Sequence, residues 1–325
     1  MNKNLIYTAL LCVASTALAA GGIELMLRIK NSSMKNYDIE MWRYAKELKV
    51  PSPDPSLGHE HIRNASALLQ SVEIRLNEWG LRGGPVMVPA PKRRILILGG
   101  SIPMGWGVPE QDTVSARLQQ RLRDEGEDVE VLNGGVGNYN AERYIERFFT
   151  QLEGLKPTDI VVLYFLRDAE RLDPGGGNIL LRNSALAVTT WIAFTRLANK
   201  SGEQSLVDHY KDVYREDQPG YIEMKKRLKM LAAYAHAHNV RLYMAMTPDV
   251  HDLANYRFDF IHDRMKSIAH DDGMQYVDLL PALGKRPPED VWAMPGDPHP
   301  NAIAHGLMAD ALLPAIRLPS SAPSR

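Results

Sequence analysis

The stretch Arg94-Ile95-Leu96-Ile97-Leu98-Gly99-Gly100-Ser101 is a short apolar run that ends in two glycines and a serine. Such a run is typical of a β-strand, and the glycines predict a tight turn before a helix over residues 111–125. Ser101 then lies where backbone N–H groups converge at a helix start, a position suited to stabilising an oxyanion and equally to capping the helix. This motif alone leaves both roles open.

The same alternation of strand and helix continues downstream. Strands are expected over residues 129–133, 159–165, 240–246 and 274–279, and helices over residues 140–153, 221–239, 259–271 and 301–313. The run DIVVLYF at 159–165 is almost continuously apolar, which is typical of a strand buried on both faces. The pattern predicts an α/β fold, a doubly wound, flavodoxin-like three-layer sandwich with a parallel five-stranded sheet.

Composition excludes several classes of protein. The 325 residues are 45% hydrophobic, enough for a sizeable core, and 38 basic against 39 acidic residues leave no electrostatic surface for a nucleic acid. The single cysteine, Cys12, excludes an intramolecular disulfide and a cysteine-based zinc site. His236 and His238 would point to different faces of one helix. We therefore expect neither a metal nor any other cofactor.

The N-terminal segment, residues 1–30, is interpreted as a membrane anchor or a signal segment. Residues 5–23 (LIYTALLCVASTALAAGGI) carry no charge, and roughly 20 apolar residues suffice to cross a bilayer. A retained anchor is the favoured interpretation, cleavage after the A-x-A sequence at 17–19 is the main alternative, and a buried core helix is the third. Lys3 favours a cytoplasmic N-terminus. We expect a periplasmic protein anchored to the inner membrane or, after cleavage, a secreted one.

The rest of the chain divides into three parts. Residues 31–90 contain several prolines and no sustained period, so they are interpreted as a wrapping segment and linker. The α/β domain is expected over residues 91–318, followed by a tail at 319–325. Within the domain, the apolar stretch at 185–194 is typical of core or of a lid over the site, and it could also lie against a membrane.

Ligands of open parallel sheets bind beyond the carboxyl ends of the strands, so the turns after the strands are the place to look for chemistry. Ser101 follows the first strand. His299 lies between two prolines just before the last helix, with Asp297 two residues ahead of it. A serine, a histidine and an aspartate are the parts of a nucleophile, base and orienter set. A phosphate-binding loop is disfavoured because GGSIPMGWG lacks the lysine of that motif.

Four blocks in this order resemble the SGNH (GDSL-like) hydrolases, in particular the membrane-anchored bacterial set. They are LGGS at 98–101 with GWGV at 105–108, VLNGGVGNYN at 131–140, FLRD at 165–168 and DPHPN at 297–301, and NEWGLRG at 77–83 resembles an upstream segment of the anchored members. The resemblance covers the chain from about residue 77 onward. It implies that Ser101 is the nucleophile, His299 the base and Asp297 its orienter.

The resemblance also implies an oxyanion hole formed by the N–H groups of Ser101 and Asn138, together with Arg167. Asn138 stands where the family has glycine, and Arg167 where it has an asparagine whose amide completes the hole. An inward Arg167 can stabilise an oxyanion or bind an anionic substrate group, whereas an outward one leaves the hole a donor short, which typically costs about a hundredfold to a thousandfold in rate. Trp106 and Tyr139 flank the site, where they are candidates for substrate binding or for ordinary packing.

Together these features predict an exported serine esterase that removes an acyl group, such as acetyl, from an envelope or exopolysaccharide glycan. Family and compartment alone suggest the glycan. An O-acyltransferase with the same triad and a non-catalytic glycan-binding component of a polysaccharide machine are the alternatives, the latter favoured by Arg167 and opposed by the intact Ser101 and His299 pair. Expected partners are the acylated glycan, the inner membrane and proteins of polysaccharide biosynthesis or export, and no nucleic acid.

Overall fold

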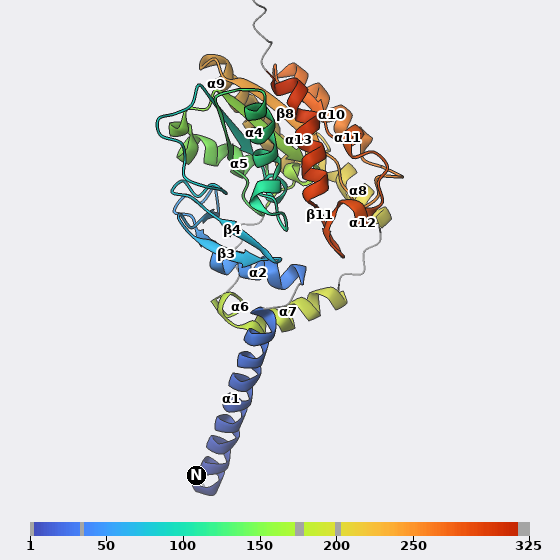
Figure 1. Cartoon of the computed structure of the whole chain (residues 1–325). Helices are drawn as coiled ribbons and strands as arrows, with labels where there is room; N and C mark the ends of the chain where they lie inside the picture. The colour runs from blue at the N-terminus through green and yellow to red at the C-terminus, as the bar shows by residue number, and fades with distance from the viewer. Residues whose placement is uncertain (1–2, 33–35, 173–178, 199–202, 318–325) are drawn as a thin grey trace, which may run out of the picture.

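A parallel sheet of five strands forms the centre of the protein (Figure 1). The computed structural model describes residues 3–32, 36–172, 179–198 and 203–317, so the expected tail at 319–325 lies outside the described residues. The strands are β5 (Arg93–Leu98), β6 (Val129–Asn133), β7 (Asp159–Phe165), β8 (Arg241–Thr247) and β9 (Gln275–Asp278). Their order is β6-β5-β7-β8-β9, and every neighbouring pair is parallel. This is the flavodoxin-like order, which confirms the predicted fold.

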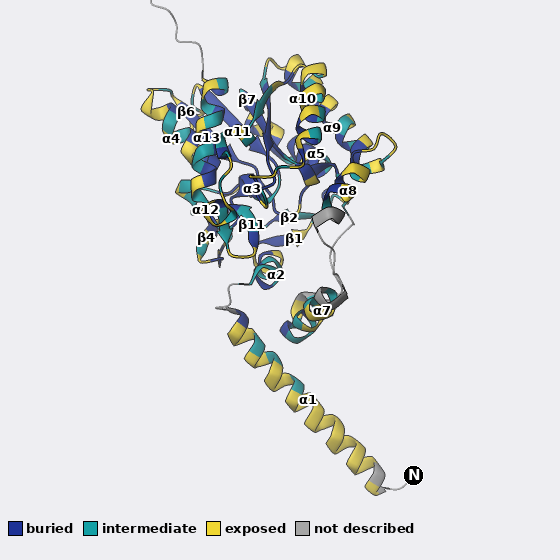
Figure 2. Cartoon of the chain, turned by 90° about the vertical axis from the view of Figure 1, so that its right-hand side faces the viewer, coloured by how far each residue is buried: buried dark blue, intermediate teal, exposed yellow. Residues whose placement is uncertain are grey.

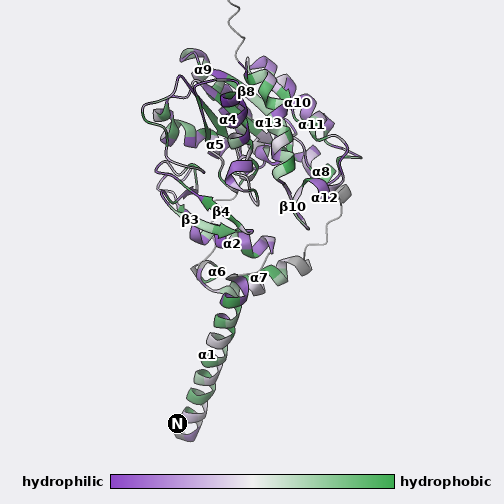
Figure 3. Ribbon diagram, viewed as in Figure 1, coloured by the Kyte–Doolittle hydropathy of each residue, from purple (hydrophilic) through white to green (hydrophobic). Residues whose placement is uncertain are grey.

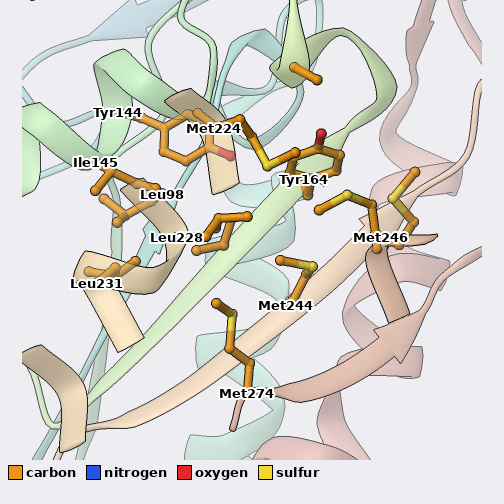
Figure 4. Packing of buried hydrophobic residues seen from close by; sticks show 14 of the residues in the cluster. Leu98, Tyr144, Ile145, Tyr164, Met224, Leu228, Leu231, Met244, Met246 and Met274 are labelled. Carbon is orange, nitrogen blue, oxygen red and sulfur yellow. The ribbon is translucent and has the colours of Figure 1, made fainter. Parts of the chain in front are cut away.

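Helices cover both faces of the sheet and complete three layers. One face packs against α5 (Ala141–Arg147), α9 (Pro219–Ala237) and α10 (Asp259–Asp271), and the other against α4 (Val114–Asp124), α11 (Leu280–Leu283) and α13 (Ala302–Ile316). Figure 4 shows the first interface, where Leu228 of α9 lies over the methionines of β8. The four strands β5 to β8 are buried on both faces, which explains why their sequences are largely apolar, whereas the edge strand β9 is partly exposed.

The helix expected over residues 140–153 ends earlier than predicted. It is α-helical only to Arg147 and continues as a π-helix, η2 (Phe148–Leu152), and a 3-10 turn, η3 (Glu153–Leu155). Phe148, Leu152 and Leu155 are all buried. The segment departs from the regular 3.6-residue helix because these side chains pack against the sheet.

The segment before the sheet has regular structure of its own. It contains α2 (Tyr37–Glu47) and two antiparallel pairs, β1 (Lys49–Pro51) with β2 (His59–His61) and β3 (Ser66–Leu69) with β4 (Val72–Arg75). β3 and β4 are joined by two residues with positive φ, 47° at Gln70 and 64° at Ser71, the backbone of a two-residue type I′ hairpin turn. This segment packs against Trp106 through its own small apolar cluster.

The remaining elements of the body are short, except α8 (Glu203–Val213), and α6 (Ile179–Asn183) and α7 (Ala185–Ala198) lie beside α1 (Lys3–Ser32). The short elements are α3 (Ser101–Met104), η1 (Glu110–Asp112), η4 (Leu166–Ala169), α12 (Pro288–Val291), β10 (Trp292–Met294) and β11 (Asp297–Pro300). β10 and β11 form a short antiparallel pair with an irregular register, and β11 leads directly into α13.

The first helix, α1 (Lys3–Ser32), projects from the body as a single rod (Figure 1). It is exposed along its length in Figure 2 and largely hydrophobic in Figure 3. Within the described residues it is the one helix that is long and apolar enough to cross a membrane, over Ile6–Asn31, and no part of its apolar window is buried in the protein. The third interpretation, a core helix, is therefore wrong.

Candidate active site

Ser101 is positioned by the turn between β5 and α3. Gly99 has a φ of 153°, and a Cβ built there would lie 2.7 Å from Pro103 Cγ and 2.8 Å from the carbonyl oxygen of Leu163. Only glycine allows the chain to leave β5 so close to β7. The turn makes Ser101 the first residue of α3, at the point of the sheet where the order of the strands reverses.

His299 and Asp297 complete a hydrogen-bonded chain with Ser101. Ser101 Oγ lies 2.8 Å from His299 Nε2, and His299 Nδ1 lies 2.6 Å from Asp297 Oδ1. The same carboxylate oxygen accepts the backbone N–H of His299 at 3.2 Å. The spacing of two residues between aspartate and histidine therefore brings the two side chains into direct contact, because both lie on β11.

The second oxygen of Asp297 is held by two residues from outside this block. Gln70 Nε2 donates to Asp297 Oδ2 at 2.6 Å, and the indole Nε1 of Trp106 donates to the same oxygen at 3.1 Å. Burial raises the pKa of Asp297, but the hydrogen bonds and the charge of His299 and the amide of Gln70 outweigh it, so the pKa lies below its ordinary value. Both oxygens of the Asp297 carboxylate therefore accept hydrogen bonds.

The two aromatic residues expected beside the substrate differ in position. Trp106 is only 1% exposed and its indole donates to Asp297, which is the packing role that the sequence also allowed. Its contact with a substrate stays a prediction. Tyr139 does line the cleft, and its hydroxyl donates a hydrogen bond to the carbonyl oxygen of His59. Its ring is therefore fixed in place.

A cleft of about 640 Å³ opens in front of Ser101 and His299. Its polar and aromatic walls come from several parts of the chain: Tyr37, Asn138, Tyr139, Asn140, Arg167, Asp168, Glu170, His209, Tyr210, Asp249 and His251. The ring of Tyr37 stacks on His299, with centroids 5.8 Å apart and planes inclined by 28°. The first turn of α2 therefore covers one side of the histidine.

Asn138 lies in the cleft wall with a φ of 66°, in the left-handed region that asparagine tolerates better than most residues. The carbonyl oxygen of Gly137, in the same peptide unit, accepts hydrogen bonds from Lys49 Nζ at 2.7 Å and from His59 Nε2 at 3.1 Å. Tyr44 accepts the N–H of Gly137 at 2.9 Å. Because a trans peptide is planar, these bonds turn the N–H of Asn138 away from Lys49.

Lys49, which bonds the Gly137–Asn138 peptide, is unusual because lysine side chains are rarely buried as this one is. Burial, followed by repulsion from Arg143, holds its pKa well below the ordinary value. Burial and the nearby Lys49 likewise lower the pKa of His59 to about 3. These side chains act as hydrogen-bond donors to the loop.

Arg167 follows β7, and its side chain is 62% exposed while lining the cleft. Its Nε lies 3.3 Å from one oxygen of Glu170, whose other oxygen is 3.0 Å from His209 Nε2. The Arg167 guanidinium thus pairs with the carboxylate of Glu170, which also lines the cleft. Its role as an oxyanion donor stays a prediction.

The sequence did not mark several residues of this site, among them Tyr37, Lys49 and Gln70, and it gave no sign of the environment of Asp168. The first three lie in the segment without periodicity, where no motif marks them. Asp168 was part of the third block, but its environment was not predictable: burial raises its pKa to about 7, although Phe165 N–H and Tyr144 hydroxyl both donate to it. In the described part of the chain, no group of three or more His, Cys, Asp or Glu side chains is arranged to hold a metal ion.

Comparisons with known proteins found similarity among solved structures only. No protein-family model and no curated protein matches the chain. The chain is similar to solved structures of esterases at the level of the fold. The psychrotrophic esterase EstA from Pseudoalteromonas sp. is 18% identical, with a TM-score of 0.43 over 69% of this chain and 97% of that chain. A catalytic mutant of Axe2, an acetylxylan esterase from Geobacillus stearothermophilus, is 13% identical, with a TM-score of 0.48 over 72% and 98%. LAE5, an α/β hydrolase from the metagenome of Lake Arreo, is 19% identical, with a TM-score of 0.46 over 69% and 94%.

Proposed function

We propose that the protein is a serine esterase in which Ser101, His299 and Asp297 form the catalytic triad. The observation that carries this proposal is the continuous chain of hydrogen bonds from Ser101 Oγ through the imidazole to a bonded carboxylate. Asp297 accepts a hydrogen bond from Nδ1–H of His299, which leaves Nε2 free to accept the serine proton. The chain ends in an open cleft, so an ester can reach the serine.

The reaction follows from these positions. His299 Nε2 takes the proton of Ser101 Oγ as that oxygen attacks the ester carbonyl, and the N–H groups of Ser101 and Asn138 stabilise the oxyanion. The imidazolium then gives its proton to the departing alcohol oxygen, leaving an acyl-enzyme. Water, deprotonated by the same imidazole, releases the acid and restores the serine.

We propose an O-acetylated glycan of the cell envelope as the substrate. The cleft walls carry amides, carboxylates, imidazoles and phenols, the groups that hydrogen-bond sugar hydroxyls and stack on sugar rings. The resemblance of the four sequence blocks to anchored bacterial SGNH hydrolases supports the same substrate class. The apolar helix α1 supports a location on the periplasmic side of the inner membrane, with the helix retained.

The test is covalent labelling of the full-length protein in detergent with a fluorophosphonate, followed by intact mass measurement. We expect one adduct on the parent protein, none on Ser101→Ala, and labelling slowed by at least about a hundredfold on His299→Ala, because the serine then has no base. Ser267→Ala, an exposed serine of α10, is the matched control and should label like the parent.

A second measurement fixes the reaction class. Release of acetate from an acetylated oligosaccharide in water should require Ser101. If the folded protein takes no adduct and releases no acetate, the esterase proposal is wrong. If acetyl groups move to an added sugar acceptor with no free acetate formed, the hydrolase is replaced by a transferase.

A further inference from the structure

Helix α7 presents an exposed apolar face that the fold does not use. Trp191 is 53% exposed and Phe194 is 64% exposed, and their spacing of three residues puts them on one side of the helix. Ala185 and Val188 are buried and both belong to the first half of the helix, so α7 is docked by that half. The interpretation of this stretch as core is therefore wrong for the second half, which holds the two large rings.

The first turn of α7 is fixed to a defined level of α1. The carboxylate of Glu24 accepts the backbone N–H groups of Ala185 at 3.0 Å and Leu186 at 2.9 Å, together with the Ser184 hydroxyl at 2.8 Å. Four residues further along α1, Arg28 donates to the carbonyl oxygen of Asn183 at 2.7 Å. These bonds set the start of α7 beside Glu24.

That level coincides with the end of the apolar part of α1. Residues 5–23 are uncharged, and Glu24 is the first charge after them. Nineteen helical residues at about 1.5 Å each span roughly 28 Å, close to the ~30 Å hydrocarbon core of a bilayer. When α1 crosses a membrane, Glu24 therefore lies at one boundary of the hydrocarbon, and the start of α7 lies there with it.

From that point α7 extends sideways from the body-side end of α1, below α2 (Figures 1 and 2). We propose that α7 is an interfacial helix that lies on the bilayer entered by α1, with Trp191 and Phe194 inserted at the boundary of headgroups and acyl chains. An indole has an apolar ring and a polar N–H, which suits it to this boundary. Membrane contact then has two points, the anchor and the flat helix.

The test measures how deep Trp191 lies, using the full-length protein in phosphatidylcholine liposomes. Lipids brominated near the headgroup quench a shallow indole more than lipids brominated near the chain end. The contribution of Trp191 is the difference between the parent protein and Trp191→Phe. We expect shallow bromolipid to lower that difference signal by about twofold or more, as insertion to interfacial depth requires.

A matched control places an indole elsewhere on the surface. In the Trp191→Phe background, Met230→Trp on the exposed side of α9 should respond to aqueous iodide and not to bromolipid. Two results would overturn the proposal. If Trp191 is quenched by iodide alone, α7 lies in water; if neither quencher reaches it, protein covers the helix, as in contact with a second copy.

Discussion

At the scale of single residues, Gln70 is the side chain that connects the N-terminal segment to the triad. Its amide donates to Asp297 from a position 227 residues earlier in the chain. Gln70→Asn keeps a side chain that tolerates the left-handed backbone but is one methylene too short to reach the carboxylate. Because a hydrogen bond to a charged group is lost, we expect kcat to fall by roughly tenfold with KM nearly unchanged.

The control for Gln70 is Leu68→Gln, an exposed position on the same hairpin. It should leave both constants unchanged. If the two variants lose activity equally, the hairpin acts through its stability, and Gln70 has no special role in positioning Asp297.

Lys49 is predicted to act through the loop that carries Asn138. Lys49→Met keeps the length of the side chain and removes the donor to the Gly137 carbonyl oxygen. The direction of the Asn138 N–H is then held less firmly, since His59 alone bonds that carbonyl oxygen. We therefore expect kcat to fall by about tenfold to a hundredfold, less than complete loss of an oxyanion donor. Steady-state kinetics on an activated acetyl ester, beside Lys46→Met on the exposed side of α2, would measure it. A loss confined to KM would contradict this role.

Asp168 is predicted to make stability depend on pH. Its pKa is about 7 in the folded protein against 3.8 in the unfolded chain, so the folded state binds the extra proton between these values. The stability that the folded protein gains from this proton is present in full below pH 4 and is lost as the pH rises towards 7. Thermal unfolding at several pH values should show that Asp168→Asn removes this part of the pH dependence. A parallel pH profile for both proteins would contradict it.

At the scale of elements, three neighbouring strands are tied together at the end of the sheet opposite the cleft. The buried carboxylate of Asp159 on β7 accepts from Arg93 of β5 at 2.8 Å and from Arg241 of β8 at 2.8 Å. Asp159→Asn removes one of two carboxylates bonded to the buried Arg93, the other being Glu127 at 2.8 Å. We therefore expect a loss of stability smaller than the about 3–5 kcal/mol that leaving a buried charge unpaired typically costs.

Chemical denaturation would measure the effect of Asp159→Asn. Because this network lies away from the cleft, the activity of the folded fraction should match that of the parent protein. A loss of specific activity without a loss of stability would show that this end of the sheet influences the site.

The elements themselves were largely predictable from the sequence, because local pattern determines them. The strands at 129–133 and 159–165 have the predicted bounds, and the two-sided burial of β7 follows from its apolar run. The helix over 140–153 was not predicted correctly because buried Phe148 and Leu152 override its period. The strands before residue 91 were missed since they have only three or four residues each.

At the scale of the whole molecule, the site depends on contacts between distant parts of the chain. The sequence placed Ser101, Asp297 and His299 on adjacent turns, because parallel strands bring their carboxyl ends together. It gave no sign that Tyr37 stacks on His299 or that Gln70 bonds Asp297, because such contacts depend on how the N-terminal segment packs and not on a local pattern. The same holds for Trp106, whose burial follows from that packing.

The hairpin of β3 and β4 has a practical consequence for anyone who shortens this gene. A fragment that begins at residue 91 retains all five strands of the sheet and both residues that move the proton, and it satisfies a fold-based definition of the hydrolase unit. It lacks Gln70, whose amide bonds Asp297, Tyr37, whose ring stacks on His299, and Lys49, which bonds the loop that carries Asn138. On the proposed mechanism the functional unit therefore begins near residue 36, more than fifty residues before the first strand of the sheet.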